Sequence, residues 1–264
     1  MLSFQGHQVH VVDQGNGPPV LFLHGNPDTS DIWRDLIAKL SVHHRCLAPD
    51  LPGYGHSVAA PDFDCSLEHL AKFVDDLVIQ IGLHEQISLV VHDIGGQFGL
   101  AWAVKHPEKV RRIAIFNTAF SPDYRWTALH RIWRTPLLGE LAQRLTSRRA
   151  FTREMKKGAS RLTSEQIDRI FDRITPAMKQ MALRIFRTTE LAHFHGWDTQ
   201  LRELASRIPV HVLWSDDDPY IAPEFAERFG AQAVSRYRGF GHWLPLEAPE
   251  LVGSELQAFL ARTD

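Results

Sequence analysis

The chain has 264 residues, of which 44% are hydrophobic and 23% are charged, a composition typical of one large globular domain with room for an inserted subdomain. The formal net charge of −2 gives no reason to expect a nucleic acid or an anionic membrane as a partner. Two cysteines, Cys46 and Cys65, are too few for a disulfide framework and indicate free thiols in a reducing compartment.

The N-terminus lacks the basic and apolar regions of a signal peptide, and no apolar run is long enough to span a bilayer. We therefore expect a soluble, cytoplasmic protein. Its 15 histidines form no H-E-x-x-H arrangement, so we expect neither a metal nor a cofactor. The expected partners are a small apolar organic substrate and water. The sequence leaves open whether the chain is a monomer or a homodimer.

Apolar runs and helical periodicities alternate along the first part of the chain. A weakly alternating segment and a turn (8–18) indicate a hairpin that enters a sheet. Strands then follow at 19–23, 45–49, 86–91 and 111–116, with helices at 31–40, 66–81 and after residue 94. This alternation predicts an α/β fold, a mostly parallel eight-stranded sheet flanked by helices.

The alternation breaks after Asn117. Residues 118–207 have a helical pattern rich in Arg, Trp and Phe and interrupted by prolines. Strands return at 209–214 and 233–237, and a helix at 249–261 closes the chain. We therefore divide the chain into an α/β core of residues 1–117 and 208–264 and an inserted helical cap of residues 118–207.

The most informative segment is 89–96, where a buried strand ends in His92-Asp93 and two glycines follow. A strand-to-helix turn of this kind is a nucleophile elbow, which normally presents a serine above the sheet. Here it presents Asp93. A carboxylate is charged at neutral pH and can displace a leaving group from an alkyl carbon, giving an ester on the enzyme. The alternative is an aspartate that only caps a turn.

Two further polar segments lie at strand ends. Residues 216–218 are three aspartates directly after a strand, and His242 lies between Gly241 and Trp243 before the last helix. The order nucleophile, acid, histidine is that of the α/β-hydrolase fold, and all three fall at the carboxyl edge of the sheet. The alternatives are a solvated acidic loop and a structural histidine.

A fourth segment, His24-Gly25-Asn26-Pro27, ends an earlier strand. Its backbone, with the N–H of Ile94, would form a hole that stabilises an oxyanion. The side-chain amide of Asn26 could also donate a hydrogen bond to a leaving group. The alternative is a plain Asn-Pro turn.

With these motifs in place, the chain resembles the α/β-hydrolase superfamily along essentially its whole length. Within it, the chain resembles the aspartate-nucleophile branch of haloalkane dehalogenases, epoxide hydrolases and fluoroacetate dehalogenases. The resemblance implies that Asp93 is the nucleophile, that His242 activates the hydrolytic water and that Asp218 orients His242. Some haloalkane dehalogenases carry the acid at the place of Asn117. The motifs that are similar lie at 24–27, 50–57 and 241–242.

The chain also departs from these families. Ile94 stands where haloalkane dehalogenases have a halide-binding tryptophan and fluoroacetate dehalogenases an arginine. A tryptophan of the cap (Trp126, Trp133 or Trp197) could replace that donor. Epoxide hydrolases use cap tyrosines as proton donors, and the predicted cap holds only Tyr124, with His193 or His195 as possible substitutes. We expect Tyr124, Trp126 and Trp197 to line the substrate pocket.

The sequence therefore predicts a hydrolase that forms an alkyl-enzyme ester at Asp93, which a His242-activated water then cleaves. Asn26 and Val91 favour halogenated alkanes or haloacids as substrates. The alternatives are an epoxide hydrolase, a lactone-type hydrolase and a catalytically silent hydrolase fold used for binding.

Overall fold

The computed structural model describes residues 1–262, and its centre is a seven-stranded sheet in the order β3-β5-β4-β6-β7-β8-β9. Only β3 runs antiparallel, against β5, and every other neighbouring pair is parallel. The strands are β3 (Val11–Gln14), β4 (Pro19–Leu23), β5 (Arg45–Pro49), β6 (Ile87–His92), β7 (Val110–Phe116), β8 (Val210–Ser215) and β9 (Ala233–Tyr237).

The predicted eighth strand is not part of this sheet. Strands β1 (Leu2–Phe4) and β2 (His7–Val9) pair with each other in a separate two-stranded hairpin. The apolar alternation at 8–13 is interrupted at His10, whose backbone N–H donates to Ser57 Oγ at 2.9 Å instead of continuing a strand ladder. Gln8 forms an isolated bridge with Val58. The number of strands predicted for the sheet was therefore wrong by one.

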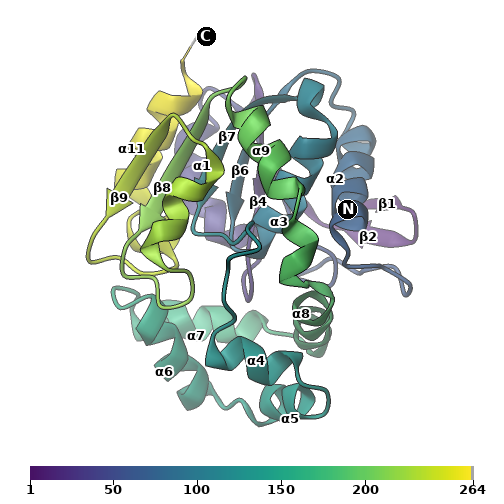
Figure 1. Cartoon of the computed structure of the whole chain (residues 1–264), viewed down its shortest axis with the longest axis vertical. Helices are drawn as coiled ribbons and strands as arrows, with labels where there is room; N and C mark the ends of the chain where they lie inside the picture. Colours follow the sequence, from purple (N-terminus) through teal and green to yellow (C-terminus); the bar gives the residue numbers. More distant parts are fainter. Residues whose placement is uncertain (263–264) are drawn as a thin grey trace.

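The central strands are buried on both faces, as their uninterrupted apolar runs predict. In β4, Leu21 and Leu23 enter one hydrophobic core, and Val20 and Phe22 enter a second core on the opposite face. Helices α2 (Leu67–Ile81), α3 (Ile94–Lys105) and α9 (Trp197–Ala205) cover the first face. Helices α1 (Arg34–Leu40) and α11 (Pro249–Leu260) cover the other (Figure 1).

Five helices form a layer across one end of the sheet (Figure 1). We call them the cap helices: α4 (Ala128–Arg134), α5 (Leu138–Leu145), α6 (Arg148–Gly158), α7 (Ser164–Arg173) and α8 (Pro176–Thr188). Four of them begin after a hydroxyl residue that accepts a hydrogen bond from the first turn, which explains why the chain starts helices there. These residues are Thr127, Ser147, Thr163 and Thr175.

The expected cap boundary at residue 207 does not match the packing. Helix α9 falls inside the predicted cap, but it packs against α3 on the face of the sheet. Its buried residues Leu201 and Leu204 belong to the same hydrophobic core as α2 and α3. We therefore end the cap before α9. Short 3-10 helices complete the chain at Ser30–Trp33, Pro107–Lys109, Leu191–Phe194 and Pro223–Phe229, with α10 at Leu244–Glu247.

Among residues 1–262, no helix combines the length and the apolarity that a membrane crossing requires.

Candidate active site

The turn between β6 and α3 projects Asp93 above the sheet. Asp93 has φ 49° and ψ −128°, a conformation that residues other than glycine seldom adopt. The neighbouring backbone is too close for larger residues: a Cβ at Gly95 would lie 2.2 Å from the carbonyl oxygen of Leu23. Thr118 Oγ1 donates to the Asp93 carbonyl at 2.6 Å and fixes the turn. Gly95 of the sequence motif is therefore needed for the tight turn that exposes the carboxylate.

The two carboxylate oxygens of Asp93 have different surroundings. Oδ2 accepts a hydrogen bond from the backbone N–H of Asn26 at 2.8 Å. Oδ1 lies 3.8 Å from His242 Nε2. Burial raises the pKa of Asp93, while the charge of His242 and the backbone N–H groups of Asn26 and Ile94 act in the opposite direction. One oxygen is thus held by the backbone N–H of Asn26, and the other faces His242.

Asp218 and Asn117 fix the orientation of His242. Asp218 Oδ2 lies 2.7 Å from His242 Nδ1 and accepts a second hydrogen bond from Asn117 Nδ2 at 2.9 Å. Asp218 Oδ1 accepts the backbone N–H groups of Tyr220 at 2.7 Å and Ile221 at 3.2 Å. A carboxylate has only acceptor oxygens, so Nδ1 of His242 must carry the proton in its contact with Asp218. Nε2 is then the nitrogen that faces Asp93.

The charges around His242 determine its protonation. Burial alone lowers the pKa of His242. Asp218 acts in the opposite direction through its charge and its hydrogen bond, Asp93 adds a second negative charge, and the pKa of His242 is raised to about 9. His92 supports the same loop, since its Nε2 lies 2.9 Å from the carbonyl oxygen of His242. At neutral pH His242 is therefore protonated in the free protein, held by two carboxylates.

We expect Asp93→Asn to lower the pKa of His242 from about 9, because the variant removes one of the negative charges that raise it. An NMR titration of the His242 ring measures this directly. The pKa of His242 is higher in the folded protein than its ordinary value of about 6.5. Protonation of His242 therefore stabilises the wild-type fold fully at pH values below about 6.5. This stabilisation is lost as the pH rises through 9. An unchanged His242 titration in Asp93→Asn would contradict the charge coupling between the two side chains.

A cavity of about 400 Å³ lies over this site, between the sheet and the cap helices. Asn26, Asp93, Ile94 and His242 line it, and so do Tyr124 and Trp126, two of the three residues expected in the pocket. Trp197 does not: it lies on α9, where its ring packs under the ammonium of Lys105 at 4.8 Å. The aromatic pattern placed Trp197 in the pocket only because α9 was assigned to the cap.

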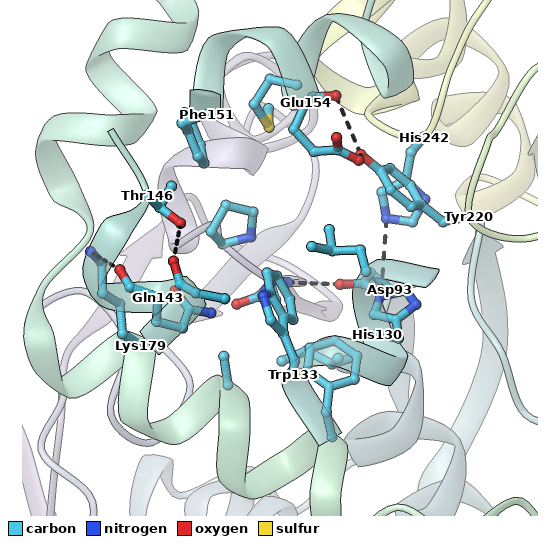
Figure 2. Close-up of a pocket in the computed structure, with 18 of the residues that line it drawn as sticks. Asp93, His130, Trp133, Gln143, Thr146, Phe151, Glu154, Lys179, Tyr220 and His242 are labelled. Carbon is cyan, nitrogen blue, oxygen red and sulfur yellow. Dashed lines mark hydrogen bonds and ion pairs between the residues drawn. The ribbon is translucent and has the colours of Figure 1, made fainter. Parts of the chain in front are cut away.

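Three more aromatic side chains line the cavity; of these, the sequence named only Trp133, as one of three tryptophans that could replace the halide donor. Trp133 and His130 come from α4, and Tyr220 follows Asp218 by two residues (Figure 2). Burial lowers the pKa of His130 to about 4, so its ring is neutral at pH 7. The Tyr220 ring packs edge-on against His242, with 5.3 Å between the ring centroids. Its closeness to the predicted acid was the one sequence signal for Tyr220.

A family model described as the alpha/beta hydrolase fold matches residues 18–249. The chain belongs to the α/β-hydrolase fold family. Among curated members, the haloalkane dehalogenase of Agrobacterium fabrum is 43% identical over 112 residues, which cover 42% of this chain and 36% of that protein. The cis-3-alkyl-4-alkyloxetan-2-one decarboxylase of Shewanella oneidensis is 37% identical over 149 residues, 54% of this chain and 46% of that protein. The matched stretches thus span less than half of these relatives.

Solved structures of α/β-hydrolases match over nearly the whole chain. A candidate ancestral haloalkane dehalogenase is 26% identical with a TM-score of 0.80, covering 98% of this chain and 97% of that chain. A laboratory-evolved variant of potato epoxide hydrolase has a TM-score of 0.80 over 98% of each chain, but at 19% identity it shows the fold alone. The predicted α/β-hydrolase superfamily is confirmed, and the haloalkane dehalogenase relatives belong to the branch that the sequence resembles.

Proposed function

We propose that this α/β-hydrolase cleaves an alkyl carbon–leaving group bond through an ester formed on Asp93. One observation carries the proposal: the Asp93 carboxylate has one oxygen held by the backbone N–H of Asn26 and the other directed toward a histidine–carboxylate pair. A serine-type elbow would need a base before its first step, whereas an ionised carboxylate needs none. This arrangement therefore separates the nucleophile from the base, so that each serves a different step.

In the first step, Oδ1 of Asp93 attacks the substrate carbon. The new bond joins Oδ1 to carbon, and the leaving group departs with the electron pair of the broken bond. The same step removes the negative charge of Asp93, one of the charges that raise the pKa of His242. The pKa of His242 therefore falls once the ester has formed, so Nε2 releases its proton to solvent and can then accept one from water.

In the second step, His242 Nε2 takes a proton from water, and the water oxygen attacks the ester carbonyl carbon. The carbonyl oxygen is Oδ2, which already accepts the N–H of Asn26 at 2.8 Å. Negative charge that develops on Oδ2 is thus stabilised without rearrangement. The intermediate collapses when the bond between the Asp93 carboxyl carbon and Oδ1 breaks. The alcohol leaves with that oxygen and a proton from His242, and Asp93 keeps the oxygen of the water.

The favoured leaving group is a halide, as the sequence indicates. Tyr54 donates its hydroxyl to Asn26 Oδ1 at 3.3 Å, so the amide nitrogen of Asn26 is the end of that side chain left for a leaving group. Ile94 offers only an aliphatic side chain at the cavity wall. The haloalkane dehalogenase relative supports the same assignment.

An epoxide is the second candidate, and Tyr220 favours it. Ring opening requires a proton donor, because an alkoxide is a poor leaving group. Tyr124 is committed elsewhere, since its hydroxyl donates to the Tyr220 carbonyl at 3.2 Å. The Tyr220 hydroxyl also has a partner, Glu154, but at the longer distance of 3.4 Å. Tyr220 lines the cavity beside His242, and burial raises the pKa of its phenol, which keeps it protonated. The oxetanone decarboxylase relative makes a strained lactone a further substrate to test.

A single turnover in oxygen-18 water, with the protein in excess, tests the ester pathway on a panel of bromoalkanes, epoxides and β-lactones. We expect the product alcohol to carry ordinary oxygen and the protein to gain about 2 Da at Asp93, because the water oxygen enters the carboxylate. A product labelled in the first turnover would show direct attack by water instead. The substrate class that gives the unlabelled product identifies the leaving group.

A further inference from the structure

The cavity has a second polar end, away from the carboxylate of Asp93. Figure 2 shows Lys179, Gln143 and Thr146 on one side of the cavity, and Asp93 and His242 on the other. The rest of the lining is largely apolar and includes Trp133, Phe151, Met178 and Phe186. An apolar cavity with polar groups at two separate ends fits an elongated molecule with a polar terminus.

Lys179 is the cation at this second end. It lies on α8, is half-buried, and its Nζ donates to the carbonyl oxygen of Gln143 in the last turn of α5 at 2.9 Å. An ammonium has three N–H donors, so this contact leaves two of them. Within residues 1–262, no carboxylate lies within ion-pair distance of Lys179 Nζ. Glu154, a carboxylate that lines the cavity beside Tyr220, is paired with Lys157 at 2.6 Å. Lys179 thus keeps both charge and donors for a ligand.

The distribution of charge along the chain favours an anion at the same place. The segment of the cap helices, residues 128–188, carries 14 Lys and Arg against 5 Asp and Glu, whereas the rest of the chain carries 15 against 26. Exposed Arg153 also lines the cavity and has no ion pair within residues 1–262. A positive field around a cavity raises the local concentration and the arrival rate of anions. A neutral haloalkane would gain nothing from this field.

We propose that Lys179 forms an anion subsite and that the substrate is a long-chain alkyl carboxylate whose distal carbon bears the leaving group. The carboxylate binds at Lys179, the alkyl chain fills the apolar cavity, and the electrophilic carbon reaches Asp93 Oδ1. The reacting end of this substrate rests on the function proposed above. The anion subsite does not, because it depends only on binding.

Calorimetric titration with octanoate and with 1-octanol tests the subsite without any chemistry. We expect the wild-type protein to prefer octanoate and Lys179→Met to bind octanoate about 10-fold more weakly, since a charge-assisted hydrogen bond is lost while the aliphatic stem stays. The matched control is Lys156→Met: Lys156 lies in α6, also donates to a backbone carbonyl, that of Leu162, and is not among the residues lining the cavity. Equal octanoate affinity in wild type and Lys179→Met, or equal weakening in both variants, would overturn the subsite.

Turnover then separates this inference from the proposed reaction. With an ω-bromo-octanoate, we expect Lys179→Met to raise KM about 10-fold and added salt to raise the wild-type KM, because salt screens the attraction. Lys156→Met should behave as wild type. Octanoate binding that depends on Lys179, without turnover of any bromide, would support the subsite and contradict the reaction. Turnover of bromoalkanes, together with equal octanoate affinity in wild type and Lys179→Met, would support the reaction and contradict the subsite.

Discussion

Asp93→Ala is expected to lower kcat by about 10⁴-fold or more, because it removes the atom that bonds to the substrate and not merely a group that assists. Asp218 cannot take its place, since it is occupied by His242, Asn117 and the backbone N–H groups of Tyr220 and Ile221. Release of halide, or formation of a diol from an epoxide, measures the loss. Turnover within about 10-fold of wild type would rule out Asp93 as the nucleophile.

Loss of folding must be separated from loss of chemistry in this variant. Burial raises the pKa of Asp93, which means that the fold disfavours its charged form. We therefore expect Asp93→Ala to resist thermal unfolding at least as well as the wild type, as is common where active-site groups are held at a cost in stability. Asp62→Ala, at an exposed loop residue, serves as a carboxylate control and should keep full activity.

Local sequence patterns predicted the elements of the fold whose consecutive residues share the same surroundings. The strands expected at 19–23, 45–49 and 233–237 have the same bounds in the structure. For the first two, the reason is that a strand buried on both faces needs only a short apolar run between turns. The elbow was equally readable, since a buried apolar strand, a polar residue and two glycines follow one another directly in the chain.

Features that depend on distant partners could not be predicted in this way. The hairpin of β1 and β2 separates from the sheet because His10 and Gln8 find partners at Ser57 and Val58, far along the chain. Sequence analysis identifies the position of Asn117 only as a place where some haloalkane dehalogenases carry the catalytic acid. In the structure, Asn117 Nδ2 instead donates to Asp218 Oδ2 from a neighbouring strand end. Its role follows from the order of strands β7 and β8, which no local pattern encodes.

His242→Gln is expected to stop the reaction after the first step, so that the alkyl-enzyme ester accumulates. The attack by Asp93 Oδ1 needs no base, whereas the water of the second step does, and loss of a general base lowers a rate by about 10²–10⁴-fold. Intact-protein mass after exposure to a bromoalkane should rise by the mass of one alkyl group, with one halide released per chain. An epoxide would instead add its whole mass, because its oxygen stays attached.

The pH of this experiment matters, because the positive charge of His242 lowers the pKa of Asp93 in the wild type. Without that charge the pKa of Asp93 rises further, and the nucleophile must be kept ionised by working above neutral pH. The double variant Asp93→Ala/His242→Gln is the matched control and should gain no mass. An adduct that persists in the double variant would place the alkylation on another side chain. Normal turnover by His242→Gln would show that another group activates the water, and the division of labour between Asp93 and His242 would then be wrong.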